Sequence, residues 1–76
     1  MTTAYVFVQF GLADPIGTLS AIREIAGVKQ AHTVMGPIDI IALVEVADLS
    51  ALGETTMAIR AVDGVASNDT RLAWPI

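Results

Sequence analysis

The feature that most constrains the fold is a pair of apolar stretches joined by a short turn, in residues 27–46 (GVKQAHTVMGPIDIIALVEV). The dipeptide Gly36-Pro37 separates two stretches rich in β-branched residues, which is typical of a β-hairpin. The second stretch, 38–46, is apolar at nearly every position, whereas a strand with one face in solvent normally alternates. Both faces of this strand must therefore be covered, and Asp39 places a carboxylate at its turn end.

The size of the chain sets a second limit. A domain of 76 residues buries only about 60–65% of the surface of its unfolded chain, which leaves it marginally stable alone. There is no cysteine to form a disulfide, yet 54% of the residues are hydrophobic. Such a chain exposes a large apolar surface as a monomer, and large exposed apolar patches mark association sites. We therefore predict a single domain over 1–76 that forms a homo-oligomer.

Charge and hydropathy exclude several partners. The net charge is −4, and the basic residues form no cluster along the sequence, so we expect no direct contact with nucleic acid. They are Arg23, Lys29, Arg60 and Arg71. No apolar run reaches the ~18–20 residues of a membrane helix, and the N-terminus lacks the charged region and cleavage site of a signal peptide. We expect a cytoplasmic protein that does not contact a membrane.

Local signals predict the order β-α-β-β-α-β. Strands are expected at 4–10, 28–35, 38–46 and 66–74. Asp14-Pro15 and Asp48 are typical helix starts, and Gly27 and Gly64 suit the left-handed position that closes a helix. Helical spacing predicts two buried stripes. The first is Ile16, Leu19, Ile22 and Ala26; the second is Leu49, Leu52, Thr56, Ile59 and Val62.

The two halves of the chain also resemble each other. Ala21-Ile22-Arg23, Gly27-Val28 and Thr33 recur as Ala58-Ile59-Arg60, Gly64-Val65 and Thr70. Two similar halves fit a split β-α-β arrangement. The predicted fold class is therefore α+β: a ferredoxin-like sandwich whose four-stranded antiparallel sheet carries both helices on one face. The other face is left open for a second copy.

Catalytic chemistry has little support in the sequence. His32 is the one candidate general base, with Thr33 or Glu45 to orient it, but no nucleophile or paired carboxylate has a defined relation to it. The alternative is a strand histidine at a subunit face or in solvent. We predict neither an enzyme nor a bound metal or cofactor.

Three polar residues could instead converge at one end of the sheet. Asp39 follows the hairpin turn, and Asn68 and Thr70 are two apart on the last strand, so they share a face. A carboxylate suits an ammonium group, while an amide and a hydroxyl suit a carboxylate, which together fit an amino acid. The alternative is equally open: Asp39 caps the hairpin backbone, and the other two are ordinary polar residues of a sheet edge.

Taken together, the sequence resembles the effector-binding and oligomerisation domain of the Lrp/AsnC family, known as the RAM domain. The resemblance runs from Ala4 to Leu72, and its strongest element is the Gly-x-x-Asp turn formed by Gly36 and Asp39. The residues that carry it are Ile25-Ala26-Gly27-Val28, Ala31, Val34-Met35-Gly36-Pro37-Ile38-Asp39, Val44-Glu45-Val46, Ile59, Gly64-Val65 and Thr70.

The resemblance implies dimers formed sheet to sheet, assembled into rings that are commonly octamers, with small effectors such as amino acids bound between dimers. Gly36, Asp39 and Thr70 match positions that contact the effector. Asn68 replaces the first residue of a Thr-x-Thr-like pair, and Ile38 stands where an aromatic residue is common. Family members usually carry a helix-turn-helix before this domain, so this chain looks like a stand-alone form.

Three hypotheses follow. The first is a regulatory module that binds an amino acid or related metabolite and modulates transcription by associating with full-length regulators. The second is an assembly protein without a ligand. The third, a compact ferredoxin-like oxygenase, depends on His32 alone.

Overall fold

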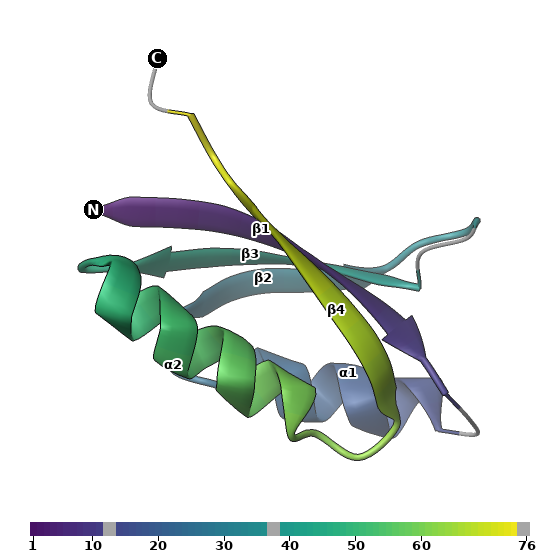
Figure 1. Cartoon of the computed structure of the whole chain (residues 1–76). Helices are drawn as coiled ribbons and strands as arrows, with labels where there is room; N and C mark the ends of the chain where they lie inside the picture. Colours follow the sequence, from purple (N-terminus) through teal and green to yellow (C-terminus); the bar gives the residue numbers. More distant parts are fainter. Residues whose placement is uncertain (12–13, 37–38, 75–76) are drawn as a thin grey trace.

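The computed structural model describes residues 1–11, 14–36 and 39–74. Its elements follow the predicted order (Figure 1). They are β1 (Thr2–Phe10), α1 (Pro15–Arg23), β2 (Val28–Thr33), β3 (Ile40–Val46), α2 (Leu49–Arg60) and β4 (Val65–Leu72). The hairpin strands are shorter at the turn than predicted, and Pro37 and Ile38 lie outside the described residues.

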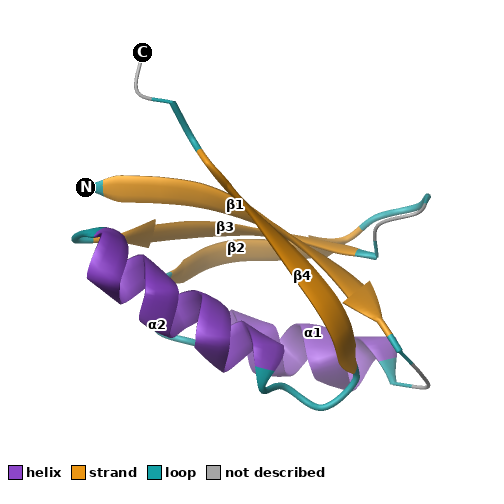
Figure 2. Cartoon of the chain, in the orientation of Figure 1, coloured by secondary structure: helices purple, strands orange, loops and turns teal. Residues whose placement is uncertain are grey.

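The strands form one antiparallel sheet in the order β2-β3-β1-β4. Both helices lie on the same face of this sheet, and no helix of the described residues covers the opposite face (Figure 2). The predicted fold class is therefore confirmed. Within the sheet, β3 and β1 are central, whereas β2 and β4 form the two edges.

The core lies between the sheet and the helices. Alternate residues of the central strands face it and are fully buried; they are Ala4, Val6, Val8, Ile40, Ala42 and Val44. Ile22 of α1 and Ile59 of α2 meet them from the helix layer. The alternation of β1 and the apolar character of β3 on its inner face thus follow from one buried layer.

The predicted helix stripes are partly wrong. Ile16 is 77% exposed and Leu49 is 64% exposed. At 3.6 residues per turn, Ile16 lies about a third of a turn around the helix from the side that Ile22 buries. The buried positions one turn before Ile22 and Ile59 are instead threonines, Thr18 and Thr55.

These two threonines tie the helices together. The hydroxyl of Thr18 in α1 donates to the carbonyl of Asp63 at 2.9 Å, in the turn after α2. The hydroxyl of Thr55 in α2 donates to the carbonyl of Ala26 at 3.3 Å, in the turn after α1. The ties are reciprocal, so the internal repeat predicted from the sequence corresponds to a repeated structural contact.

The helix starts agree with the prediction, whereas the helix ends do not. Asp14 accepts a hydrogen bond from the Gly17 N–H at 3.0 Å, and Asp48 accepts one from the Ala51 N–H at 2.9 Å, so both predicted N-caps are confirmed. The helices end earlier than predicted. Gly27 does have positive φ (96°), but it lies in the turn beyond α1, where a Cβ atom would come within 2.8 Å of Val46.

Replacing Thr18 by valine tests the reciprocal ties. Valine keeps the shape of the side chain but cannot donate to Asp63, and we expect the free energy of unfolding to fall by about 1 kcal/mol, a usual net value for one hydrogen bond. Urea denaturation followed by circular dichroism measures the change. The matched control is Thr56→Val, because the Thr56 hydroxyl bonds within its own helix, to the Gly53 carbonyl; there we expect a change within about 0.5 kcal/mol. Equal losses in the two variants would contradict the assignment.

Candidate functional site

The turn end of the hairpin holds Asp39 in a fixed position. Its backbone N–H donates to the carbonyl of Val8 in β1 at 3.1 Å, and its carbonyl accepts from the N–H of Val34 at 3.0 Å. Asp39 itself is half-buried, whereas Gly36 in the turn is exposed with φ of 125°. Ile38, the third predicted residue of this turn, lies outside the described residues. The backbone of Asp39 is thus clamped between β1 and the end of β2.

Asn68 and Thr70 share a face, as predicted. They lie opposite Val8 and Val6 in the sheet register, and both valines are buried toward the helices. The side-chain amide of Asn68 donates to the carbonyl of Thr56 in α2 at 3.2 Å. One of its donors therefore holds β4 to the helix layer.

Val8 of β1 lies between the two sets of predicted site residues, Asp39 on one side and Asn68 on the other. Asp39 bonds to its carbonyl from the β3 side, and Asn68 pairs with it from the β4 side. The structure therefore places Asp39 and Asn68 at the same end of the sheet, with β1 between them. Thr70 lies two residues farther along β4, which is about 7 Å at the usual rise of a strand.

Sequence reasoning missed a polar pair at this end of the sheet. Gln9 and Ser67 are register partners, and the Ser67 hydroxyl donates to the side-chain oxygen of Gln9 at 3.1 Å. The alternation of β1 places Gln9 on the face opposite Val8. The signal was present in the sequence, because Tyr5, Phe7 and Gln9 alternate along one strand and so share a face.

The open face of the sheet has an apolar centre. Tyr5 pairs with Leu43 and Phe7 pairs with Ile41. None of the four is fully buried, and Tyr5 is 45% exposed. These four side chains, which we call the apolar face, explain why β3 is apolar on its outer side as well as its inner side.

One edge of the apolar face carries an ion pair. Arg71 lies 2.8 Å from Asp69, and its guanidinium carbon is 5.5 Å from the centre of the Phe7 ring. The hydrogen bond that Arg71 donates to Asp69, together with the charge of Asp69, raises the pKa of the guanidinium. At the opposite edge, His32 and Gln30 line a shallow hollow of about 330 Å³ over Tyr5 and Leu43.

The structure does not bring Glu45 or Thr33 beside the side chain of His32, as the catalytic hypothesis requires. His32 pairs with Ile41, whereas Glu45 pairs with Thr3, about 13 Å farther along β3 at the usual rise of a strand. Thr33 pairs with buried Ile40 and therefore lies on the opposite face from His32. Among the described residues, no three His, Cys, Asp or Glu side chains are grouped as metal ligands.

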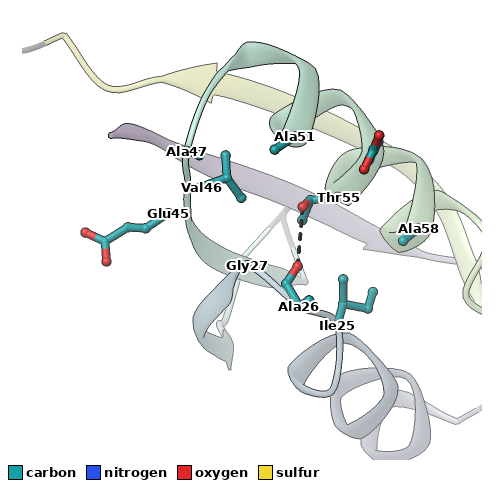
Figure 3. A pocket seen from close by; sticks show the side chains of 10 residues that line it. Ile25, Ala26, Gly27, Glu45, Val46, Ala47, Ala51, Thr55 and Ala58 are labelled. Carbon is teal, nitrogen blue, oxygen red and sulfur yellow. Dashed lines mark hydrogen bonds between the residues drawn. The ribbon is translucent and has the colours of Figure 1, made fainter.

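A second hollow lies in the helix layer. It has a volume of about 510 Å³ and is bounded by the turn after α1, the end of β3 and α2. Figure 3 shows Ala47, Ala51 and Ala58 around it, the Thr55 hydroxyl bonded to Ala26, and Glu45 directed away from it. Its walls are mainly apolar side chains, and its polar lining residues are Glu45, Glu54 and Thr55. In the described part of the chain, no helix has the length and hydropathy to cross a membrane.

Comparison with known proteins gives a family. The family model described as the Lrp/AsnC ligand binding domain matches residues 3–74. A solved protein of Thermus thermophilus, TTHA0845, is 31% identical with a TM-score of 0.92, and the match covers 100% of this chain and 96% of that one. The hypothetical protein PHS023 of Pyrococcus horikoshii is 25% identical with a TM-score of 0.87 and coverage of 100% and 93%.

A larger protein shares the fold. The transcriptional regulator NMB0573 of Neisseria meningitidis, solved as a complex with L-Met, is 14% identical with a TM-score of 0.87. The match covers 97% of this chain but only 50% of that one. No curated protein sequence matches this chain.

The bond between Asn68 and α2 gives a prediction about stability. Removing the amide in Asn68→Ala breaks the contact with the Thr56 carbonyl, and we expect the free energy of unfolding to fall by about 1 kcal/mol. Thermal unfolding measures the change. Ser67→Ala is the neighbouring control, because it loses only an exposed bond to Gln9, and surface substitutions of this kind stay within about 0.5 kcal/mol. An unchanged stability in Asn68→Ala would contradict a role for this amide in holding β4 to α2.

Proposed function

The chain belongs to the Lrp/AsnC ligand-binding domain family, and on this basis we propose that it is a regulatory module that binds an amino acid or a related small metabolite. The observation that carries the proposal is the position of Asp39. Its carboxylate lies at the end of the Gly-x-x-Asp turn, on a backbone held by hydrogen bonds to Val8 and Val34. A carboxylate at this position is suited to an ammonium group, because the two can form charge-assisted hydrogen bonds.

The remaining contacts of the proposed site come from both sides of Val8. Asn68 uses one N–H on Thr56, which leaves its second N–H and its oxygen for a ligand. Thr70 adds a half-buried hydroxyl on the same face. We propose Gly36 for the wall of the site by its match to the family motif, and Ile38 by its position in the same turn, where an aromatic residue is common in the family. The L-Met bound by NMB0573 supports an amino acid as the kind of ligand.

We propose that the module works as an oligomer. The apolar face leaves Tyr5, Phe7, Ile41 and Leu43 incompletely buried in one copy, and a second copy packed sheet to sheet would cover them. Neighbouring dimers in a ring, as in the octamers expected for the family, would then bring Asp39 of one copy beside residues of another. Association with full-length regulators of the family would carry the signal to transcription.

The alternative is an assembly protein without a ligand. The bond between Asn68 and Thr56 favours it, because that bond gives one proposed site residue a role in holding the fold. The apolar face supports both proposals equally. Titration with candidate ligands separates them.

Isothermal titration against the common amino acids tests the effector proposal. We expect at least one to bind the unmodified chain. Asp39→Asn keeps the shape of the side chain but removes its charge, and we expect it to weaken binding by tenfold or more, about 1.4 kcal/mol, as when a charged partner is lost.

The control for this titration is Asp48→Asn. Asp48 is an exposed aspartate that comes after the end of β3, whereas Asp39 precedes its start. Asparagine caps a helix about as well as aspartate, so the substitution should preserve α2. The same change of charge there should leave the affinity unaltered. If no amino acid binds the unmodified chain, the assembly protein becomes the better description.

Sedimentation tests the role of the apolar face. Leu43→Glu places a charge at its centre, where burial of an unpaired carboxylate is strongly unfavourable, and we expect the oligomer to dissociate toward monomer. Leu49→Glu makes the same substitution at an exposed position on α2 and should leave the oligomer intact. A monomeric unmodified chain at micromolar concentration would contradict the proposed assembly.

A further inference from the structure

Two basic residues that lie apart in the sequence, Arg23 and Lys29, line a groove at one edge of the sheet. A groove of about 530 Å³ follows the β2 edge. Its lining residues are Arg23, Val28, Lys29, Gln30, Ala31 and His32. Two of the four Lys and Arg residues and the single histidine of an acidic chain thus line one groove. Arg23 and Lys29 form no cluster along the sequence, but the turn after α1 reverses the chain and brings Arg23 beside β2.

Arg23 is held in place by the strand that it borders. Its Nε and Nη2 atoms donate to the carbonyl of Ala31 at 2.9 and 2.7 Å. A guanidinium carries five N–H donors, so three remain for another partner. Because the side chain is already ordered, a carboxylate that binds it meets a smaller entropic cost.

No acidic side chain lines this groove. Among the described residues, the ion pair found is that of Arg71 with Asp69, on the other edge strand. The charges of Arg23 and Lys29 are therefore not neutralised locally. Uncompensated charge in a concave surface attracts and orients a partner of the opposite sign.

The second half of the chain provides an internal comparison. In the sequence repeat, Arg23 corresponds to Arg60, Lys29 to Ala66 and His32 to Asp69. The β4 edge therefore has the same backbone arrangement, but it has an alanine in place of the lysine and an aspartate in place of the histidine. Lys29 and His32 of the β2 edge are thus replaced by Ala66 and Asp69 on the β4 edge, so these two side chains are not a requirement of the fold.

The β2 edge also offers main-chain hydrogen bonds, except at the Ala31 carbonyl, which Arg23 already bonds. An edge strand presents unpaired N–H and C=O groups on which an extended peptide can add as a further strand. Two β2 edges would repel each other through Arg23 and Lys29, so a second copy in that arrangement is disfavoured. We propose that the β2-edge groove binds an acidic, extended segment of a partner protein. This surface is separate from the effector site at Asp39.

A peptide of alternating Glu and Val, labelled with fluorescein, is the probe. Fluorescence anisotropy is measured on the full chain with no amino acid present, so failure here leaves the effector proposal untouched. We expect saturable binding that weakens with added salt, because exposed charges are screened beyond a Debye length of about 8 Å at physiological ionic strength. The matching peptide of Lys and Val should not bind.

Substitutions locate the site. Lys29 is exposed, and we expect Lys29→Glu to raise the Kd about tenfold through loss of attraction and added repulsion. Arg60→Glu makes the same kind of charge reversal at the equivalent of Arg23 in the second half, and we expect at most about a twofold change, within the small range of exposed charges. Circular dichroism of both variants verifies that they are folded. Neither variant changes Arg23, whose bond to Ala31 supports the fold.

Three results would overturn the proposal. One is no binding of the Glu-Val peptide by the unmodified chain, and another is an equal loss in Lys29→Glu and Arg60→Glu, which would indicate a general charge effect. The third is equal binding of a Glu-rich peptide in which proline replaces the valines. Proline cannot donate to a strand ladder, so that result would exclude strand addition.

Discussion

The reciprocal threonine ties are the contacts on which the arrangement of this small domain depends. Each hydroxyl reaches the turn that follows the other helix, Thr18 to Asp63 and Thr55 to Ala26. Neither helix can shift along the sheet without losing a buried hydrogen bond, and an unsatisfied buried polar group costs more than the bond itself contributes. With both helices held against one face, the turns after α1 and α2 are fixed as well, and these turns deliver the chain into the two edge strands.

The one-sided helix layer also defines what remains exposed. The inner residues of β3, such as Ile40 and Val44, are fully buried, whereas Ile41 and Leu43 on the outer face are only partly buried. Their neighbours there are Phe7 and Tyr5 of β1 and His32 and Gln30 of β2. Among the described residues, no further element covers that face. Exposed apolar side chains also lie on the helices, such as Ile16 and Leu49, but on the open face they adjoin one another across two central strands, which makes this face suited to a second copy.

The sequence predicted features that depend on near neighbours and missed those that depend on tertiary register. The Asp14 and Asp48 caps were correct because a cap needs only a backbone N–H three residues away. The order of strands and helices along the chain was correct because it was predicted from turn residues and alternation, which are also local. Ile16 was misplaced because the buried stripe holds threonine one turn before Ile22, and a polar residue gives no apolar signal. The bond from Asn68 to Thr56 depends on how β4 lies against α2, which no local spacing encodes.

The internal repeat explains why two unrelated surfaces can coexist in so short a chain. The ties and glycine turns are duplicated, so the positions around them are free to differ between the halves. Asp69 on the β4 edge is neutralised by Arg71, which also lies over Phe7 and borders the apolar face. Its counterpart His32 borders the same face from the β2 side, beside Lys29 in the groove. An acidic partner at β2 would therefore bind at the rim of the apolar face. Its binding and the proposed packing of two copies on that face would then influence each other through His32.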